Sequence, residues 1–435
     1  MTSRGTFTVE LRDPLWGPIA VSGGELAVID TPAFQRLRRI KQLGFAEYVF
    51  PGAVHHRYLH SIGAMHVAGR LADQVLGSAP GLDDGDRARL RQLARLGALL
   101  HDIGHPPLSH AAEALLPDRS LLYVHGEPMG EGRASHEDLT RKLVADSPLS
   151  AVIDDAFGDL DIEADDVAAI IEESPGDRAE RFVVGGRDFW PLLHGMVSGE
   201  MDVDRMDYLR RDAYFAGVEY GHYDTSWLIS NAVVLEDEGK MRLAIDLRAL
   251  ATFEHFLLAR YHMFQMVYFH PKSDIYDAML RAWLGSVGDE ARFPADPRQY
   301  VGCHDAWLMQ RLHESRDPWA KRVERLEPYQ LLTELRTDQD LAAKDRIRDA
   351  LEQDGVHALW ITAKPVLSKY ALKAPKDRTD PLLVVDKRPP IGRQRVHRVE
   401  QVTDLYSRYE RTLKLERVYV APEERDRAKA VLAGL

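Results

Sequence analysis

The stretch Leu99-Leu100-His101-Asp102-Ile103-Gly104-His105 decides the interpretation of this chain. It closes an apolar helical run over residues 88–101 with an adjacent histidine and aspartate. An imidazole and a carboxylate on neighbouring residues can reach one divalent cation if the chain turns there. The mixture of nitrogen and oxygen ligands favours a hydrolytic metal over a structural one. Because a His-Asp pair alone is a weak signal, its meaning depends on further ligands elsewhere in the chain.

Composition limits the classes of protein to consider. Of the 435 residues, 45% are hydrophobic, which is enough for a sizeable core. The net charge of −12 argues against a nonspecific coat on nucleic acid. The single cysteine, Cys303, excludes internal disulfides and fits a reducing compartment. No apolar stretch is long enough to span a bilayer, so we expect no membrane association and a cytoplasmic location.

The periodicity predicts a mainly α fold with a helical core, a small N-terminal β-hairpin and a smaller α+β C-terminal lobe. The predicted domains are residues 1–30, 31–300 and 301–435. Asp30-Thr31-Pro32 predicts a helix start, with an Asp or Thr cap and an early proline. Helical spacing of apolar residues recurs over 62–76, 88–101, 137–145, 203–216 and 249–284.

Other segments have a different pattern. Residues 228–247 predict a short β insertion, and the charged segment 305–353 predicts helices. Strands are expected within 357–367, 382–386 and 416–421. Residues 364–398 carry ten Lys or Arg against three Asp or Glu, which we interpret as a solvated loop. The alternative is a site for regulatory phosphates or single-stranded nucleic acid, with Arg393, Arg395 and Arg398 as contacts.

Further metal ligands are present at two other helix starts. His60 lies in Arg57-Tyr58-Leu59-His60-Ser61, ahead of the apolar pattern. Asp204 and Asp207 lie three residues apart in Asp202-Val203-Asp204-Arg205-Met206-Asp207-Tyr208, so they share a helix face. Taken singly, each is more simply an ordinary histidine or a helix cap. Together with His101 and Asp102 they indicate a metal site.

The chain resembles the HD-domain phosphohydrolases, and among them the deoxynucleoside triphosphate (dNTP) triphosphohydrolases of the sterile-alpha-motif/HD type and their bacterial relatives. The resemblance covers roughly residues 10–290. Besides the two segments above, it rests on the block from Asp30 to Gly44, on Val49-Phe50-Pro51-Gly52-Ala53, on residues 101–110 and on Ser135-His136-Glu137. It implies the metal ligands His60, His101, Asp102 and Asp204. The metal would be Mn, Fe, Zn or Ni, with additional Mg bound to the triphosphate.

The resemblance also implies the catalytic groups. His105, His110 and His136 would lie over the phosphates, with His136 or His110 as the general acid, since histidine titrates near neutrality. Glu113 would orient His110 or the attacking water, although an exposed helix carboxylate is an equally good interpretation. Arg57, Arg205 and Arg260 would neutralise phosphate charge, because arginine forks fit phosphate oxygens. Better-known relatives have Lys at the position of Arg205.

Recognition of the sugar and base follows from the same resemblance. Tyr208 and Asp212 match residues that contact the deoxyribose, and a ring under C2′ would leave no room for a 2′-hydroxyl. Gln42 matches a residue that reads the 3′-hydroxyl, and Tyr268 one near the base edge. Phe264 and Phe269 replace a polar His and Gln of the relatives, so the base preference stays open.

The resemblance also implies how the protein is regulated and how it assembles. Asp30, Gln35 and Arg38 match positions that bind a regulatory nucleotide, although the helix pattern also explains them as a cap and a polar face. Other basic residues of that site do not align, since Pro271 and Asp246 stand at two positions; Lys272 and Arg248 lie nearby. We expect a homo-oligomer, a dimer or a tetramer.

Two other functions compete with dNTP hydrolysis. An HD phosphodiesterase or nuclease would act on cyclic nucleotides, (p)ppGpp or nucleic-acid ends. A non-catalytic nucleotide sensor or scaffold would be favoured by a missing ligand, and no ligand is missing. Tyr208 and the block from Asp30 to Gly44 favour dNTP hydrolysis.

Overall fold

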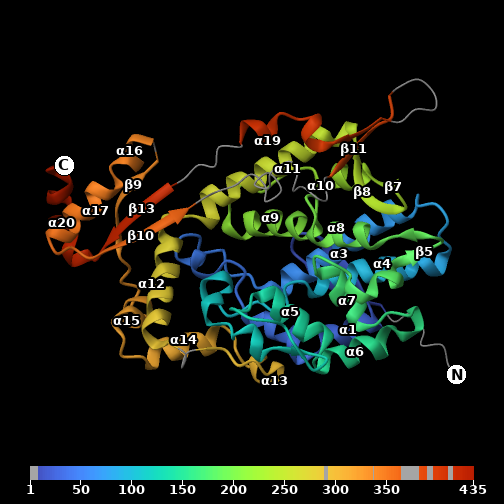
Figure 1. Cartoon of the computed structure of the whole chain (residues 1–435), viewed down its shortest axis with the longest axis horizontal. Helices are drawn as coiled ribbons and strands as arrows, with labels where there is room; N and C mark the ends of the chain where they lie inside the picture. Colours follow the sequence, from blue (N-terminus) through green and yellow to red (C-terminus); the bar gives the residue numbers. More distant parts are fainter. Residues whose placement is uncertain (1–7, 289–291, 337, 364–381, 389–394, 410–414) are drawn as a thin grey trace.

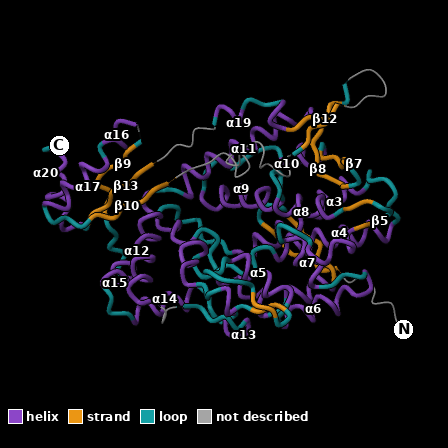
Figure 2. Tube along the Cα trace, viewed as in Figure 1, coloured by secondary structure: helices purple, strands orange, loops and turns teal. Residues whose placement is uncertain are grey.

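The fold is mainly α, as predicted, in a computed structural model that describes residues 8–288, 292–336, 338–363, 382–388, 395–409 and 415–435. Helices form a broad body, and a small sheet with its own helices lies at the end that holds the C-terminus (Figures 1 and 2). One continuous hydrophobic core fills the helical body. A smaller core lies under the C-terminal sheet.

The predicted hairpin consists of β1 (Thr8–Asp13) and β2 (Gly17–Ser22), paired antiparallel. It ends earlier than predicted, because helix α1 (Gly23–Ile29) follows at once. The Ser22 hydroxyl accepts from the Glu25 backbone N–H, and the Glu25 carboxylate accepts from the Ser22 backbone N–H. This reciprocal cap starts a helix where the two glycines suggest only a turn.

Three helices form the centre of the body: α3 (Arg57–Leu76), α4 (Asp84–Leu100) and α9 (Val203–Ala216). α3 packs against both α4 and α9, so residues far apart in sequence face each other. Around them lie α2 (Pro32–Gln35), α5 (His136–Ala145), α6 (Pro148–Phe157), α7 (Ala164–Ile171), α8 (Trp190–Ser198) and α10 (Thr225–Ser230). Thr31 caps α2 and Pro32 occupies its first turn, as the sequence predicts.

The long periodic segment 249–284 is not one helix. α11 (Leu250–Met263) runs into a π-helical turn (Phe264–Tyr268), and α12 (Pro271–Val287) begins after it. Pro271 has no N–H to continue the helical ladder, so the chain must restart there. π-turns are frequent at functional sites.

The predicted β insertion is confirmed as β7 (Ala232–Asp237) and β8 (Lys240–Asp246). β11 (Leu383–Asp386) pairs parallel with β8, and β12 (Arg395–Arg398) pairs with β11. The short strands β5 (Val183–Val184) and β6 (Arg187–Asp188) extend this sheet through β8, and β3 (Tyr123–Val124) pairs with β4 (Glu127–Pro128). A late segment of the chain thus completes a sheet of the helical body.

The C-terminal sheet has the order β10-β13-β9, built from β9 (Gln330–Leu335), β10 (Ala358–Ala363) and β13 (Leu415–Val420). The prediction of helices throughout 305–353 is wrong at β9. Helices of this part are α13 (Pro297–Tyr300), α14 (Asp305–Glu314), α15 (Pro318–Glu324), α16 (Asp338–Ala342), α17 (Lys344–Gln353), α19 (Leu405–Arg408) and α20 (Arg425–Ala433). α15 packs on α12 of the helical body, and the division at residue 300 stays a prediction.

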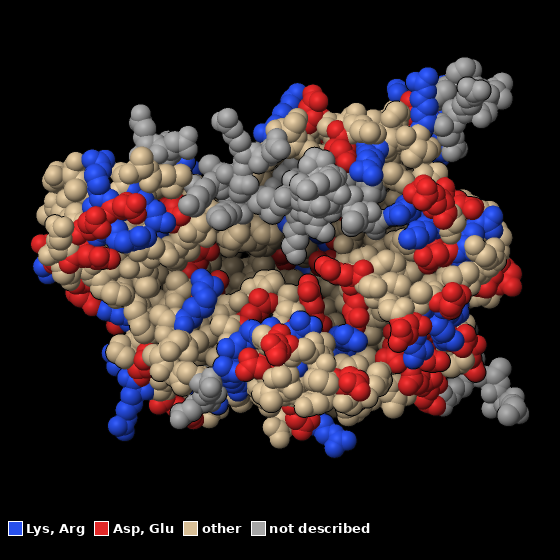
Figure 3. Space-filling view, in the orientation of Figure 1, with Lys and Arg blue, Asp and Glu red and all other residues tan. Residues whose placement is uncertain are grey.

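Acidic and basic side chains are interspersed on the face shown in Figure 3. Most of the basic segment 364–398, including Arg393, lies outside the described residues; Arg395 and Arg398 lie on β12. Among the described helices, none combines the length and apolarity needed to cross a membrane. The cellular compartment stays a prediction.

Candidate metal centre

The predicted ligands come together from three helix ends. His60 lies in the first turn of α3, His101 and Asp102 follow the last turn of α4, and Asp204 lies in the first turn of α9. One ligand atom each of His60, His101 and Asp204 lies within 4.8 Å of the others. Nε2 of His60 is 3.0 Å from Asp204 Oδ1, and Nε2 of His101 is 3.4 Å from the same oxygen. Asp102 adjoins them, with its oxygens 3.5 Å from His101 Nε2 and 3.6 Å from His60 Nε2.

The donor atoms fit a metal. Nδ1 of His60 lies 2.9 Å from Asp207 Oδ2, and Nδ1 of His101 lies 2.8 Å from the Ala98 carbonyl oxygen. Both Nε2 atoms are buried and have no hydrogen-bond partner among the described residues. A histidine that donates through one ring nitrogen presents the lone pair of the other, which is the usual arrangement of a metal ligand. His60, His101 and Asp204, with Asp102 beside them, could hold a divalent cation.

Electrostatics supports the same assignment. Burial lowers the pKa of His60, but the carboxylates of Asp204 and Asp207 more than offset this and raise that pKa to about 10. Burial raises the pKa of Asp204, yet the imidazoles of His101 and His60 hold it below its ordinary value. The carboxylates therefore favour positive charge where the imidazoles meet, and a bound divalent ion supplies such charge.

A buried ion-pair network holds Asp207, which contacts Nδ1 of His60. Asp207 binds Arg211 through two contacts of 2.8 and 2.9 Å, and Arg211 also binds Asp13 of the hairpin at 2.8 Å. The indole N–H of Trp16 donates to Asp207 at 2.5 Å. Gly63 on α3 leaves the space for this pair, because a Cβ there would lie 2.1 Å from Asp207 Oδ1. The N-terminal hairpin thus helps to fix His60, a candidate metal ligand.

Arg57 contacts Asp102, one of the predicted metal ligands. Its guanidinium donates to Asp102 through Nη1 and to the Ser109 hydroxyl through Nε at 2.9 Å. Both Arg57 and Asp102 are buried. Burial raises the pKa of Asp102, but Arg57 and neighbouring histidines hold it well below its usual range. Arg57 therefore orients this carboxylate, and its contact with phosphate stays a prediction.

A second cluster lies beside the first, as the sequence predicts. Ligand atoms of His105, His110, Glu113 and His136 all lie within 4.8 Å of one another. The rings of His105 and His136 stack at 3.9 Å, and Glu113 contacts both His110 and His136. His105 Nε2 lies 3.2 Å from Asp102 Oδ1, which joins the two clusters. His110 is exposed and His105 buried, so the cluster runs from solvent to the candidate metal ligands.

Gly104 permits this proximity. A Cβ at residue 104 would lie 2.3 Å from the His136 carbonyl oxygen and 2.3 Å from the Thr140 nitrogen. The Gly104 N–H donates to the Thr140 hydroxyl, which in turn donates to the His101 carbonyl at 3.0 Å. The start of α5, with His136, is thus in close contact with the backbone after His101.

We expect Gly104→Ala to lower the free energy of unfolding by about 1–3 kcal/mol, the usual cost of overpacking. Backbone atoms of α5 oppose the new methyl group, so His136 must move away from His105. Denaturant unfolding checks the first effect. Gly195→Ala is the matched control: nothing lies within 4 Å of its Cβ position inside α8, so we expect a gain of about 0.5–1 kcal/mol. Equal effects of the two substitutions would contradict the close-packing argument.

The predicted sugar-binding residues lie close to one another, beside His60. The Tyr208 ring lies 6.4 Å from the His60 ring and 6.1 Å from the Tyr268 ring. Asp212 accepts from the Tyr268 hydroxyl at 2.8 Å, and its other oxygen lies 2.8 Å from Nε2 of the buried His55. Gln42 is tied to the same group, since its backbone N–H donates to the His55 carbonyl.

The other two arginines predicted to contact phosphate, Arg260 and Arg205, have different surroundings. The Arg260 guanidinium lies 4.6 Å above the Phe264 ring, which itself packs against Tyr268. Arg205 turns to other partners: it donates to the carbonyls of Gly199 and Glu200 at 3.0 and 2.9 Å, and its nearest carboxylates are those of Glu200 and Asp202. A phosphate contact by Arg205 stays a prediction.

The site geometry agrees with what sequence comparison finds. Residues 57–212 match the protein family described as the HD domain, and this range contains the whole metal cluster. Residues 223–350 match the family described as the HD associated region. The chain contains an HD domain followed by an HD-associated region. We refer to His101-Asp102, which lies within the HD domain, as the HD pair.

The chain is similar in sequence to several proteins and in structure to a solved protein. The chain is 34% identical over 247 residues to "Uncharacterized protein YwfO" of Bacillus subtilis, covering 56% of this chain and 47% of that protein. It is 29% identical over 279 residues to human "Deoxynucleoside triphosphate triphosphohydrolase SAMHD1", covering 62% and 43%. A hypothetical protein from Aquifex aeolicus has a similar crystal structure, with a TM-score of 0.75, 27% identity and coverage of 98% and 100%. The chain spans about half the length of the curated relatives it matches.

The predicted regulatory residues lie at the edge of the HD domain. Arg38 donates to the Gln35 side chain at 2.7 Å and lies 3.5 Å above the Tyr58 ring. Asp30 ends α1, while Thr31 caps α2. Gln35 donates to the Ile29 carbonyl. These contacts agree with the cap-and-polar-face interpretation, and nucleotide binding there stays a prediction.

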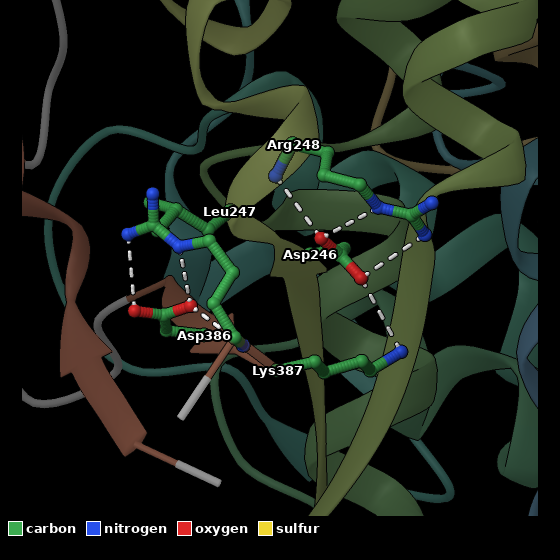
Figure 4. A pocket seen from close by; sticks show the side chains of 6 residues that line it. Asp246, Leu247, Arg248, Asp386 and Lys387 are labelled. Atoms are coloured by element: carbon green, nitrogen blue, oxygen red, sulfur yellow. Dashed lines mark hydrogen bonds and ion pairs between the residues drawn. The ribbon is translucent and has the colours of Figure 1, made fainter. Parts of the chain in front are cut away.

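A cleft of about 410 Å³ lies where the parallel strands β8 and β11 end, and it shares no lining residue with the HD site. Asp246 is the last residue of β8 and Asp386 is the last residue of β11, and each carboxylate binds the arginine two residues later (Figure 4). Lys387 reaches across to Asp246 at 3.4 Å. The lining residues are Asp246, Leu247, Arg248, Asp386, Lys387 and Arg388.

Several contacts that support the HD site could not be predicted from the sequence, although one of them has a local signal. Asp207 and Arg211 lie four apart on one helix face, so their pairing has a local signal. Trp16 and Asp13, by contrast, reach the site from the hairpin, and no local pattern predicts that contact. His55 directly precedes the His56-Arg57 segment, but only the fold brings it to Asp212.

Proposed function

We propose that this chain is a metal-dependent phosphohydrolase that converts dNTPs to deoxynucleoside and triphosphate. The observation that carries the proposal is the position of Asp102 between two clusters. On one side lie His60, His101 and Asp204, which suit a metal; on the other lies His105 with further titratable groups. Such a pair of clusters can hold a phosphate and deliver protons beside it.

Each cluster has a distinct task in this proposal. A divalent metal, when bound, would supply Lewis acidity toward a phosphoryl oxygen and a water nucleophile at neutral pH. His136 or His110 protonates the leaving 5′-oxygen, since both are near the solvent side of the cluster. Burial raises the pKa of Glu113, but His110 and His136 outweigh it and hold that pKa below its ordinary value. Glu113 stays ionised and orients both rings. Arg57 and Arg260 balance the phosphate charge.

The dNTP substrate class is supported by the group around Tyr208 and by the SAMHD1 relatives, which are named deoxynucleoside triphosphate triphosphohydrolases. Tyr208 lies beside His60, where the sugar would follow an α-phosphate held at the metal. Asp212 is held through both oxygens, so it offers a fixed acceptor for a sugar hydroxyl. A ring packed under C2′ excludes a ribose 2′-hydroxyl by contact.

We expect Tyr208→Ala to reduce the preference for dNTPs over NTPs by about tenfold or more, because steric exclusion at one atom is worth about that much. The measurement is kcat/KM for matched pairs such as dGTP and GTP. Tyr214→Ala is the control, since Tyr214 lies on the same helix but is exposed. An unchanged ratio in Tyr208→Ala would remove this residue from sugar selection.

A product assay tests the activity itself. The metal-loaded protein is incubated with dNTPs, NTPs and a cyclic dinucleotide, each alone and with GTP or dATP added. Triphosphate with deoxynucleoside supports the proposal, whereas cleavage of the cyclic substrate alone, or pyrophosphate with monophosphate, supports an HD phosphodiesterase or nuclease. Binding without turnover supports a sensor.

A rise in the rate of hydrolysis on adding GTP or dATP supports nucleotide activation, for which the basic residues Arg248, Lys387 and Arg388 offer phosphate partners. Assembly into a homo-oligomer is part of the same proposal.

A further inference from the structure

Asp305 lies far from the HD pair in sequence but contacts the segment that follows it. It is the first residue of α14 and is 8% exposed. Its Oδ1 accepts from the Leu108 backbone N–H at 2.8 Å, and its Oδ2 accepts from the Lys41 backbone N–H at 2.9 Å. Two backbone donors on a buried carboxylate form a strong, directional contact.

The segment that Asp305 holds is strained. Leu108 and Ser109 have φ angles of 54° and 57°, both in the left-handed region, and neither is glycine. This backbone conformation is unfavourable for residues other than glycine, and it persists only when its surroundings enforce it. The bond from Leu108 N–H to Asp305 is one such constraint.

The strained turn orients Ser109 toward the metal centre. The Ser109 hydroxyl donates to the Lys41 carbonyl at 3.1 Å and accepts from Arg57 Nε at 2.9 Å. Arg57 in turn donates to Asp102, the carboxylate of the HD pair. Asp305 also holds the backbone of Lys41, so this carboxylate fixes both the turn that carries Ser109 and the residue whose carbonyl accepts from the Ser109 hydroxyl.

We propose that Asp305 is a positioning residue for the metal centre: it holds the Leu108–Ser109 turn, through which Ser109 and Arg57 fix the Asp102 carboxylate. This inference deepens the proposed function and rests on it only for the kinetic readout, because metal binding is measured without substrate. It gives the HD-associated region a direct part in the HD site.

The rest of the loop has separate support. Arg36 donates to the carbonyls of Ile103 and His105 at 3.3 and 2.7 Å, and the Tyr300 hydroxyl donates to the Gly104 carbonyl at 2.8 Å. These contacts do not involve Asp305. We therefore expect its substitution to loosen the 108–109 turn while the backbone around the HD pair keeps its place.

The test is Asp305→Asn in the full chain, which keeps the shape but replaces one acceptor by a donor. We expect Mn²⁺ to bind about 10–100-fold more weakly, as for other outer partners of a metal site. Titration followed by electron paramagnetic resonance measures this affinity, and kcat and KM for a dNTP are measured in parallel. We expect kcat to fall more than KM changes. The control is Asp296→Asn, because Asp296 only caps α13 and Asn is an equally good cap.

Ser109→Ala interrupts the same connection one step closer to the metal and is informative even if Asp305→Asn unfolds. We expect a similar loss of Mn²⁺ affinity in this single variant. The double variant should be no weaker than the weaker single one, since both break one connection. Unchanged Mn²⁺ affinity in Ser109→Ala, or additive losses in the double variant, overturns the proposal. If affinities follow this pattern while no variant and no wild-type protein hydrolyses dNTPs, the positioning role stands and the proposed function fails.

Discussion

Asp204→Asn is expected to abolish measurable dNTP hydrolysis and to weaken divalent metal binding by more than the roughly 10–100-fold that outer partners of a metal site control. The substitution keeps the size of the side chain and removes the negative charge that faces two imidazoles. Nε2 of His60 and of His101 lie 3.0 and 3.4 Å from the oxygen that is altered. Without that charge, the site between the two imidazoles attracts a divalent cation less strongly.

The measurement is metal content of the purified variant together with its turnover. Asp224→Asn is the matched control, because Asp224 also stands at a helix start, where it caps α10 away from the HD site. Asparagine caps about as well as aspartate, so this control should behave as wild type. Wild-type metal content in Asp204→Asn would contradict the assignment of Asp204 as a ligand.

Asp207→Asn is expected to lower the free energy of unfolding by about 3–5 kcal/mol, the usual cost of breaking a buried ion pair on one side. Asp207 and Arg211 are both completely buried. Burial raises the pKa of Asp207, but Arg211 and His60 hold it below its ordinary value, so the native state keeps the ion. The variant leaves the Arg211 charge with Asp13 alone and removes the acceptor of His60 Nδ1.

Denaturant unfolding measures this effect, with Asp73→Asn as the control. Asp73 also pairs with an arginine, Arg91, but both side chains are exposed, so the loss should stay below about 1 kcal/mol. The change in unfolding free energy with pH has a definite sign here. Because the folded-state pKa of Asp207 is depressed, its contribution is present above the unfolded pKa and is lost as pH falls toward the folded one. A loss in Asp207→Asn no larger than that in Asp73→Asn would contradict the account of this network.

Much of the helical body could be predicted because its signals are local. Thr31 and Pro32 mark a helix start by their own chemistry, and His101-Asp102 follows an apolar helical run. The four proposed ligands lie next to helix ends, so a family pattern could locate them. The short insertion β7–β8 has alternation and a turn of its own.

Contacts between distant segments could not be predicted from such signals. β11 pairs with β8, although a long stretch of chain separates them, and β9 has no alternation of apolar and polar residues that would mark it as a strand. Asp305 stands in a charged helix where nothing distinguishes it from other acidic residues. Arg205 follows the pattern expected of a phosphate ligand, yet nearby carbonyls and carboxylates surround its guanidinium. Local patterns locate the ligands, while the fold determines which residues hold them in place.

The central claim is attack of water on the α-phosphorus of a dNTP, and the position of an oxygen label tests it most directly. The metal-loaded protein is incubated with a dNTP in H₂¹⁸O, and the products are separated and analysed by mass spectrometry. We expect one ¹⁸O atom in the released triphosphate and none in the deoxynucleoside. Label in a deoxynucleoside monophosphate or in pyrophosphate, or no turnover by protein that has bound its metal, would contradict it.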